Sequence, residues 1–259
     1  MSIKITTELI KDIRDGTGVS VMQCKNALEE AQGDIEKALI ILKKQSSAVA
    51  SKKEERSTKD GLVIVKEDEG RALLFSIRAE TDFVAKNEDF VALANKLSTI
   101  AFEEGIDSMK EKSADMINEV VQKVGEKIEL GKVEEIKGNV VNSYTHSTKN
   151  AVVVALDSGS KELARDIAMH IAAMKPSFLN KEQITEEDKK KVIEVFEKEV
   201  AESDKPEEIK QKMLEGKIST YFKEITLMDQ AYIKDPELTI AKLLEKNGAV
   251  LKGFISEVI

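Results

Sequence analysis

One order of elements, two short apolar strands followed by an amphipathic helix, is predicted twice in this 259-residue sequence. In its first occurrence, strands are expected at residues 62–65 and 72–79, joined by a turn at residues 67–70. A helix follows, and Asn87 is expected to cap its first turn. The apolar positions with strand or helix spacing are Leu73, Phe75, Ile77, Phe90, Ala94, Leu97 and Ala101.

The second occurrence begins at residue 140. Strands are expected at residues 140–146 and 151–156, with a turn at residues 147–150, and the next helix ends before Pro176. The apolar stripe of that helix is Leu163, Ile167, Ile171 and Met174. Each hairpin has an apolar face that must be covered, so two related hairpin-and-helix subdomains are predicted, and the fold class is α+β.

The first segment predicts a compact module of three short helices. Gly16 and Gly18 separate the first helix from the second. Ser20 and Gln23 have the spacing of a capping box, and Asp34 is expected to cap the third helix. The apolar positions at helical spacing are Leu9, Ile13, Val21, Cys24, Leu28, Ile35, Leu39 and Leu42.

The stretch after this module changes in composition. It combines small and charged residues without an apolar stripe, so it is expected to be a linker or the frayed end of a helix. The predicted divisions are a three-helix module at 1–45, a linker at 46–58, a first core subdomain at 59–139 and a second at 140–259, with a helical hairpin inserted at about 184–224.

The inserted hairpin is predicted from a charge-dense stretch interrupted by a break at residues 203–206. A solvated pair of charged helices with no shared seam fits the pattern equally well. The chain then closes with a short helix and an apolar strand at residues 250–259, which is expected to complete a sheet. The apolar positions that form the hairpin seam are Val192, Phe196, Val200, Ile209 and Met213.

The charge pattern argues against nucleic acid and membranes as partners. The formal net charge is -8, and 40 Lys and Arg residues are interleaved with 48 Asp and Glu residues, so no phosphate-binding surface is expected. The sequence shows no signal peptide and no stretch with the length of a membrane span, which makes the cytoplasm the expected location. The single cysteine, Cys24, excludes an internal disulfide and is expected to be buried as a small apolar residue.

Catalytic motifs are missing from the sequence. It contains no HExxH, GxSxG, GxxxxGK[ST] or GxGxxG pattern, and its two histidines are His146 and His170. His170 lies beside the apolar stripe of its helix and is expected to be structural. No catalytic residue, metal or cofactor is therefore expected, and an enzyme is the weaker class of function.

The segment AETDFVAKN at residues 79–87 lies where a strand is followed by a helix, and loops at such junctions often carry function. From the residues alone, Phe83 is expected to plug the core over the following helix and Asp82 to form a turn. An exposed aromatic beside a carboxylate would instead indicate a binding site. The spacing does not decide between the two interpretations.

Four motifs resemble the elongation factor Ts family. They occur in the family's order over nearly the whole chain: TGVSVMQCKNALEEAQGDIEKAL, ETDFVAKN, SYTHSTKNAVVVAL and AMHIAAMKP. The first two are fairly specific, and a chance match to all four in this order is very improbable. One departure from the family is the turn at residues 147–150, which replaces a small turn that contains glycine.

The resemblance implies a ubiquitin-associated-like three-helix module, a duplicated α+β core and a protruding antiparallel helical hairpin. It also implies a partner, elongation factor Tu carrying GDP, on which the chain acts as a guanine-nucleotide exchange factor without chemical catalysis of its own. The residues that the resemblance assigns to this contact are Thr81, Asp82, Phe83 and Val84 near the GTPase's magnesium and phosphate site, Thr17, Gly18, Val19 and Met22 on its nucleotide domain, and His146 in a second core contact.

Other classes of function stay open at this point. The three-helix module could bind other proteins while the rest of the chain serves as a scaffold, and an enzyme with an unfamiliar motif would reveal itself by turning over a substrate. The sequence also leaves open whether the chain works as a monomer or as a homodimer.

Overall fold

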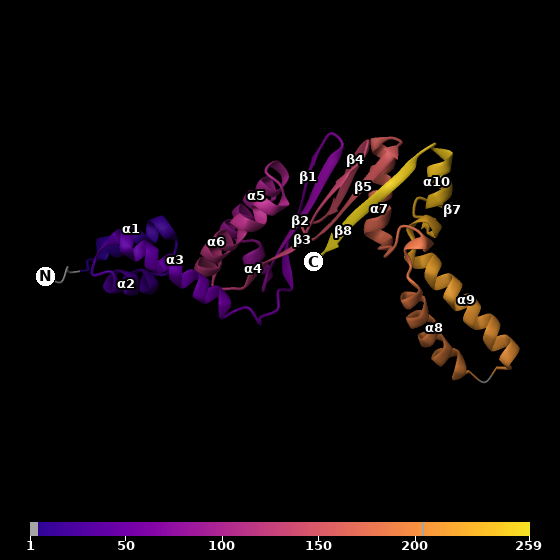
Figure 1. The fold of residues 1–259 in the computed structure, drawn as a ribbon, viewed down its shortest axis with the longest axis horizontal. Coiled ribbons are helices and arrows are strands. Elements are labelled where there is room, and N and C mark those ends of the chain that lie inside the picture. The colour runs from indigo at the N-terminus through magenta and orange to yellow at the C-terminus, as the bar shows by residue number, and fades with distance from the viewer. Residues whose placement is uncertain (1–4, 204) are drawn as a thin grey trace.

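The computed structural model describes residues 5–203 and 205–259. Residues 1–4 of the module predicted at 1–45, and one residue of the break predicted at 203–206, lie outside the described residues. Three N-terminal helices are followed by a core of helices and antiparallel sheets, which confirms the α+β class. In Figure 1 the three helices lie at one end of an elongated molecule, the sheets in the middle, and helices α8 and α9 extend at the other end.

The N-terminal helices are α1 (Thr7–Thr17), α2 (Val21–Glu30) and α3 (Ile35–Ser51). Gly18 ends α1 in the left-handed conformation at φ 70°, whereas Gly16 lies inside that helix, so the predicted break is at one glycine and not at two. Ser20 Oγ and Asp34 Oδ1 accept from backbone N–H groups and cap α2 and α3, as predicted. The buried side chains of this module are Ile13, Val19, Cys24, Ala27, Leu28, Ala31, Ala38 and Leu42.

The capping box predicted at the start of α2 is half formed. Ser20 Oγ accepts from Gln23 N–H over 3.4 Å, but Gln23 Oε1 is buried without a hydrogen-bond partner among the described residues. The reciprocal bond from the side chain at the third helical position is therefore missing.

Helix α3 ends at Ser51, so residues 46–51 of the stretch predicted as a linker or a frayed helix end continue this helix. Small residues such as Ala and Ser permit this extension, and Val49 and Ala50 pack against the first core cluster. The following residues are held by hydrogen bonds from Lys127 Nζ to the carbonyl oxygens of Glu54 and Arg56 at 2.8 and 3.0 Å. Much of the stretch predicted as a linker is therefore bound to the core.

The first sheet has the order β1 (Asp60–Asp68), β2 (Arg71–Ala79) and β3 (Ile128–Lys137). Its central strand β2 is buried on both faces. Leu73, Phe75 and Ile77 alternate toward helices α5 (Glu88–Glu103) and α6 (Ile106–Val124), as predicted. The predicted stripe of Phe90, Ala94, Leu97 and Ala101 on α5 faces the same cluster, and Asn87 caps that helix.

Helix α6 and strand β3 lie in a region where no element is predicted. Strand β3 was not predicted because it contains a bulge where it pairs with β2, between the residues opposite Phe75 and Ile77. The bulge makes the spacing of Leu130 and Val133 three instead of two, which hides the strand period. Glycine is suited to position 131 of this bulge, because a Cβ there would lie only 2.3 Å from Ser76 Oγ and would clash with it.

The second sheet has the order β4 (Val140–His146), β5 (Asn150–Ser158) and β8 (Val250–Val258). Strand β8 completes the sheet as predicted. Helices α7 (Lys161–Met174) and α10 (Ile240–Lys246) cover its outer face. Leu163, Ile167 and Ile171 are buried there, but Met174 is exposed because it is the last residue of α7.

The inner faces of the two sheets pack on each other. Val63 and Leu74 of the first sheet share a buried cluster with Val141, Val153 and Ala155 of the second. The core is thus a pair of sheets between two layers of helices, an arrangement that Figure 1 shows from the edge.

Helices α8 (Glu186–Ala201) and α9 (Glu207–Ile225) lie side by side, away from the sheets (Figure 1). Phe196 and Tyr221 meet edge to face at 5.7 Å, and Val200 is buried. Ile209 is 45% exposed, so its predicted place in the seam is wrong. The remaining short elements are the 3-10 helices η1 (Lys181–Gln183) and η2 (Leu227–Asp229) and strands β6 (Ala231–Tyr232) and β7 (Asp235–Thr239). No helix in the described part of the chain is long and apolar enough to cross a membrane.

Candidate protein-interaction site

The segment after β2 forms a one-turn helix, α4 (Asp82–Ala85). Thr81 Oγ1 caps it by accepting from Val84 N–H at 3.4 Å. Phe83 is 81% exposed, while Val84 and Ala85 are buried in the first core cluster. The interpretation of Phe83 as a core plug is therefore wrong: on so short a helix only one side can face the core, and Val84 and Ala85 occupy that side.

The backbone beneath Phe83 is fixed by a carboxylate from the segment after α6. Glu126 Oε2 accepts from the backbone N–H of Thr81 at 3.1 Å, and Oε1 accepts from its hydroxyl at 2.9 Å. Hydrogen bonds to a charged acceptor are stronger than neutral ones and hold the groups in a defined geometry. The start of α4 is consequently tied to residues far along the chain.

Glu80, next to Thr81 in the sequence, forms a second set of long-range hydrogen bonds. Its Oε1 accepts from the backbone N–H of Lys127 at 2.6 Å and from Arg56 Nη1 at 3.2 Å. Burial by itself would raise the pKa of the Glu80 carboxyl, but the Lys127 N–H and the Arg56 guanidinium lower this pKa overall. Glu80, Arg56, Glu126 and Lys127 are supporting residues that sequence patterns did not single out, because their partners are brought together only by the fold.

Asp82 is the first residue of α4 and pairs with Lys86, with 2.8 Å between Oδ2 and Nζ. The hydrogen bond from Lys86 lowers the pKa of the Asp82 carboxyl, which is therefore ionised at neutral pH. The site thus presents an apolar aromatic ring next to a paired carboxylate, a combination suited to binding a protein surface.

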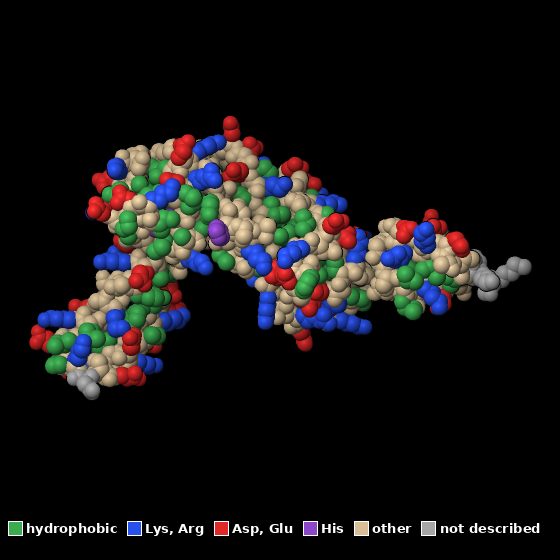
Figure 2. Space-filling model, turned by 180° about the vertical axis from the view of Figure 1, so that it is seen from behind, with side chains coloured by type: hydrophobic (Ala, Val, Ile, Leu, Met, Phe, Trp, Pro, Cys, Tyr) green, Lys and Arg blue, Asp and Glu red, His purple; other side chains and the backbone are tan. Residues whose placement is uncertain are grey.

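The charged side chains beside Phe83, Asp82 and Lys86, are of opposite sign. On the face shown in Figure 2, Lys and Arg side chains are interspersed with Asp and Glu, and apolar side chains are exposed in small groups between them. Such a surface fits contact with a specific protein better than tracking along a phosphate backbone.

His146 is exposed at the end of β4, and its Nδ1 lies 3.1 Å from Tyr144 Oη. His170, in contrast, is fully buried. Its Nε2 lies 2.9 Å from Gln230 Oε1, and its Nδ1 accepts from Ile233 N–H at 3.3 Å. Burial lowers the pKa of His170, and these contacts fit a neutral ring, so the prediction that it is structural is confirmed.

The N-terminal residues assigned by resemblance have different environments. Val19 is 4% exposed and belongs to the module's core, and Gly18 ends α1. Thr17 Oγ1 donates to Ile13 O at 2.7 Å. Met22 is 63% exposed, so it is the assigned residue here that offers a large apolar side chain to a partner.

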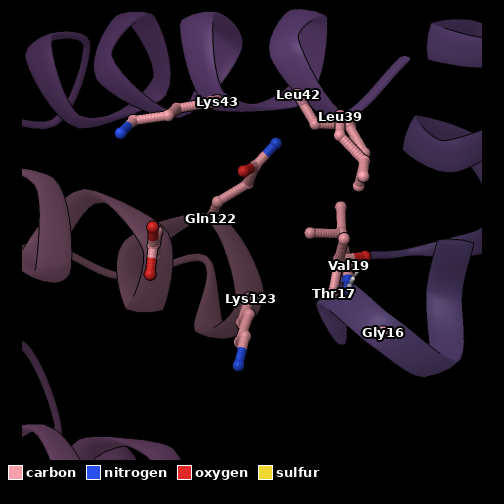
Figure 3. A pocket seen from close by; sticks show the side chains of 9 residues that line it. Gly16, Thr17, Val19, Leu39, Leu42, Lys43, Gln122 and Lys123 are labelled. Atoms are coloured by element: carbon pink, nitrogen blue, oxygen red, sulfur yellow. Dashed lines mark hydrogen bonds between the residues drawn. The ribbon is translucent and has the colours of Figure 1, made fainter. Parts of the chain in front are cut away.

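A cavity of about 310 Å³ separates the turn after α1 from helices α3 and α6 (Figure 3). Thr17 and Val19 line one side, and Gln122 and Lys123 of α6 line the other. A Cβ at Gly18 would lie 3.2 Å from Lys123 Cε, so the side chain of Lys123 reaches across to the turn. Cys24 is fully buried beneath this turn, with its Sγ 3.6 Å from Val19 O, which confirms its predicted role.

Within residues 5–203 and 205–259, no cluster of three His, Cys, Asp or Glu side chains could hold a metal ion. The arrangement around Phe83 presents an exposed ring on a fixed backbone. Such a ring offers an apolar surface for contact with another protein.

Comparison with known proteins gives a consistent family. The family model described as Elongation factor TS matches residues 80–258. The chain is 38% identical to elongation factor Ts of Hahella chejuensis, over 97% of this chain and 90% of that protein. It is 37% identical to that of Cellvibrio japonicus and 35% identical to that of Legionella pneumophila, each over 97% of this chain and over 89% and 90% of the relatives.

Proposed function

This chain belongs to the elongation factor Ts family, and from this premise we propose that the loop carrying Phe83 is the part that acts on the nucleotide bound to its partner. The chain is a nucleotide exchange factor for elongation factor Tu and has no catalytic chemistry of its own. Its partner is therefore a GTPase whose GDP must be released.

The observation that carries the proposal is the environment of Phe83. Its ring is 81% exposed, yet the backbone below it is held by Glu126 and Glu80. A rigid, exposed aromatic loses little conformational freedom on binding and is the type of residue that anchors protein interfaces. Phe83 inserts between elements of the GTPase next to its magnesium site, and Thr81, Asp82 and Val84 hold it in position.

The energetic basis is a coupling between two ligands of the same GTPase. Magnesium bridges the phosphate oxygens of GDP and neutralises their charge, so a loop that disturbs the magnesium site weakens the nucleotide. Because coupling free energy is reciprocal, an incoming nucleotide weakens the exchange factor by the same factor. Binding of GTP can therefore release the exchange factor from the GTPase, which completes the exchange cycle.

Two further contacts complete the proposed interface. Met22, with its neighbour Val21 at 54% exposure, forms an apolar pair on the N-terminal helices that docks on the nucleotide domain together with the Thr17–Val19 turn. Val19 and Gly18 act there by shaping the turn, since Val19 is buried. His146 belongs to a second contact at the end of β4.

The finer description of the fold is part of the same proposal. The three N-terminal helices form a ubiquitin-associated-like module, and the two sheets with their helices are duplicated subdomains. Helices α8 and α9 form a protruding antiparallel hairpin. The similar element order β1, β2, α5 and β4, β5, α7 supports the duplication, and the ion pair between Lys217 and Glu199 at 2.6 Å supports the hairpin.

The test is release of labelled GDP from elongation factor Tu, with and without the full chain. The chain is expected to accelerate release, and Phe83→Ala is expected to reduce that acceleration by about 30-fold, the equivalent of roughly 2 kcal/mol. Val250→Ala is the matched control, because Val250 is also exposed, at 55%, and starts a strand in the other sheet. Equal rates for Phe83→Ala and the parent chain would exclude the loop from the mechanism.

A further inference from the structure

The turn between β4 and β5 carries a lysine outside the contact residues described above. Lys149 Nζ donates to Asp60 Oδ2 at 2.6 Å. The backbone of the turn is held as well, because Thr148 O accepts from Val63 N–H at 2.8 Å. Lys149 O also accepts from Ile259 N–H at 2.9 Å. The turn is thus fixed both to the first strand of the other sheet and to the last residue of this sequence.

Asp60 depends on this lysine for its charge balance. Its side chain is 15% exposed, and Oδ1 is already engaged with the backbone N–H of Gly61 at 2.8 Å. A largely buried carboxylate that loses its cationic partner remains desolvated and unpaired, which is unfavourable. The contact between Lys149 and Asp60 therefore constrains the start of β1.

The same lysine acts on the helix that carries Phe83. The pKa of Asp82 is lowered mainly by its hydrogen bond from Lys86, and the charge of Lys149 lowers it further. The pKa of Lys86 is raised mainly by Asp82, and the charge of Asp60 raises it further. Helix α4 packs on β1, because Val84 and Ala85 share a core cluster with Leu62 and Ile64 of that strand. The ion pairs of Lys86 with Asp82 and of Lys149 with Asp60 thus belong to two packed elements, and we call these four residues the four-charge cluster.

We propose that Lys149 is a positioning residue for exchange, which ties the turn following His146 to the start of β1, where Asp60 pairs with Ala79 at the end of β2, just before the Phe83 helix. The four-charge cluster then presents the two proposed contact sites to the GTPase in one fixed arrangement, although they come from different sheets. This inference rests on the proposed function, because it concerns how the Phe83 loop is held. It assigns a role to the turn whose sequence departs from the family pattern.

The experiment compares GDP release with the full-length variants Lys149→Met, Asp60→Asn and their combination. Each single variant is expected to slow release by about three- to fivefold, which lies at the upper end of the effects found for partly exposed ion pairs. The double variant should be no slower than either single one, because both remove the same contact. Lys149→Arg should restore the rate, since it keeps the cation.

Two controls separate positioning from other causes. Lys252→Met removes an ion pair with Asp157 at 3.9 Å elsewhere on the second sheet and should leave release unchanged. In a Phe83→Ala background, Lys149→Met should have no further effect, because the loop through which it acts has already lost its ring. Melting temperatures are measured for all variants, and rates are compared where each is folded.

Three results would overturn the inference. Normal release by Asp60→Asn beside slow release by Lys149→Met would mean that the lysine touches the GTPase directly. A full additional loss in the Phe83→Ala background would mean that it acts elsewhere, and a loss that follows the unfolded fraction would mean that its role is stability alone. The proposed function fails separately, if Phe83→Ala alone exchanges as fast as the parent chain.

Discussion

At the scale of single residues, Phe83 and Phe90 occupy opposite environments within one short stretch of chain. Phe83 is 81% exposed and Phe90 is fully buried. The difference arises because α4 exposes the side that bears Phe83, whereas α5 turns Phe90 into the cluster under the first sheet. Chemically identical substitutions at the two positions therefore probe different properties.

Phe90→Ala is expected to lower the free energy of unfolding by about 3–5 kcal/mol, the usual cost of a cavity left by a core phenylalanine. Phe83→Ala is expected to leave the melting temperature nearly unchanged, because its ring packs little in the free protein. Thermal unfolding of both variants measures this. A large drop in melting temperature for Phe83→Ala would contradict the exposed position from which the interface proposal starts.

His170 makes stability depend on pH. Burial lowers its pKa in the folded chain, so the folded state binds a proton less readily than the unfolded state. Its stabilising contribution is full above the unfolded pKa of about 6.5 and declines as the pH falls below that value toward the lower folded pKa. Denaturant unfolding between about pH 7 and 5 should show this decline.

The exposed histidine, His146, serves as the control for His170. His170→Gln should flatten the pH dependence between about pH 7 and 5, while His146→Gln should retain it. If both variants kept the parent slope, another group would be responsible for it.

At the scale of elements, α4 is too short to hold itself and depends on its neighbours. Its start is bound by Glu126, which follows α6, and by Glu80 through Lys127 and Arg56. The geometry of the Phe83 loop is thus a property of the packed elements and not of its own sequence.

Glu126→Ala should therefore release the loop. Losing charged hydrogen bonds, each worth about 1.5–3 kcal/mol, should speed amide hydrogen exchange at Thr81 and Val84. GDP release should slow in parallel, whereas Glu103→Ala, at an exposed position near the end of α5, should change neither. Unaltered amide protection at Thr81 in Glu126→Ala would show that the carboxylate does not fix the loop.

The elements that sequence patterns predicted include β2 and β4 and the helices that cover them, α5 and α7. Strand β4 was predicted with its observed bounds, and β2 and the helix caps at Asn87 and Ser20 were also confirmed. Strand β3 was missed because a bulge breaks its period, and the supporting pairs around Phe83 were missed because no pattern reveals contacts between residues far apart in sequence. The exposure of Phe83 was not predictable either, because it depends on which side of α4 faces the core.

At the scale of the whole molecule, the N-terminal helices are joined to the core through α3. Val49 and Ala50 pack against the first core cluster, and Lys43 pairs with Asp115 of α6 at 2.9 Å. Because the end of α3 packs on the core, the effect of removing the N-terminal helices depends on where the chain is cut.

A chain beginning at residue 45 keeps Val49 and Ala50 and should remain folded, but its exchange activity should fall sharply because Met22 is gone. A chain beginning at residue 52 loses both packed side chains and should have a lower melting temperature as well, by about 2–4 °C per kcal/mol of lost burial for a chain of this length. Equal melting temperatures for the two truncations would place the boundary elsewhere. Full exchange by the chain beginning at 45 would contradict the docking role of the module.

If Phe83 acts at the magnesium site of elongation factor Tu, as we propose, the defect of Phe83→Ala must depend on magnesium. GDP release is measured with the parent chain and with Phe83→Ala, in magnesium and after its removal by a chelator. We expect a strong defect of Phe83→Ala in magnesium that largely disappears without it, because the step that the ring promotes has then already occurred. A defect of equal size in both conditions would show that the ring does not act through the magnesium site.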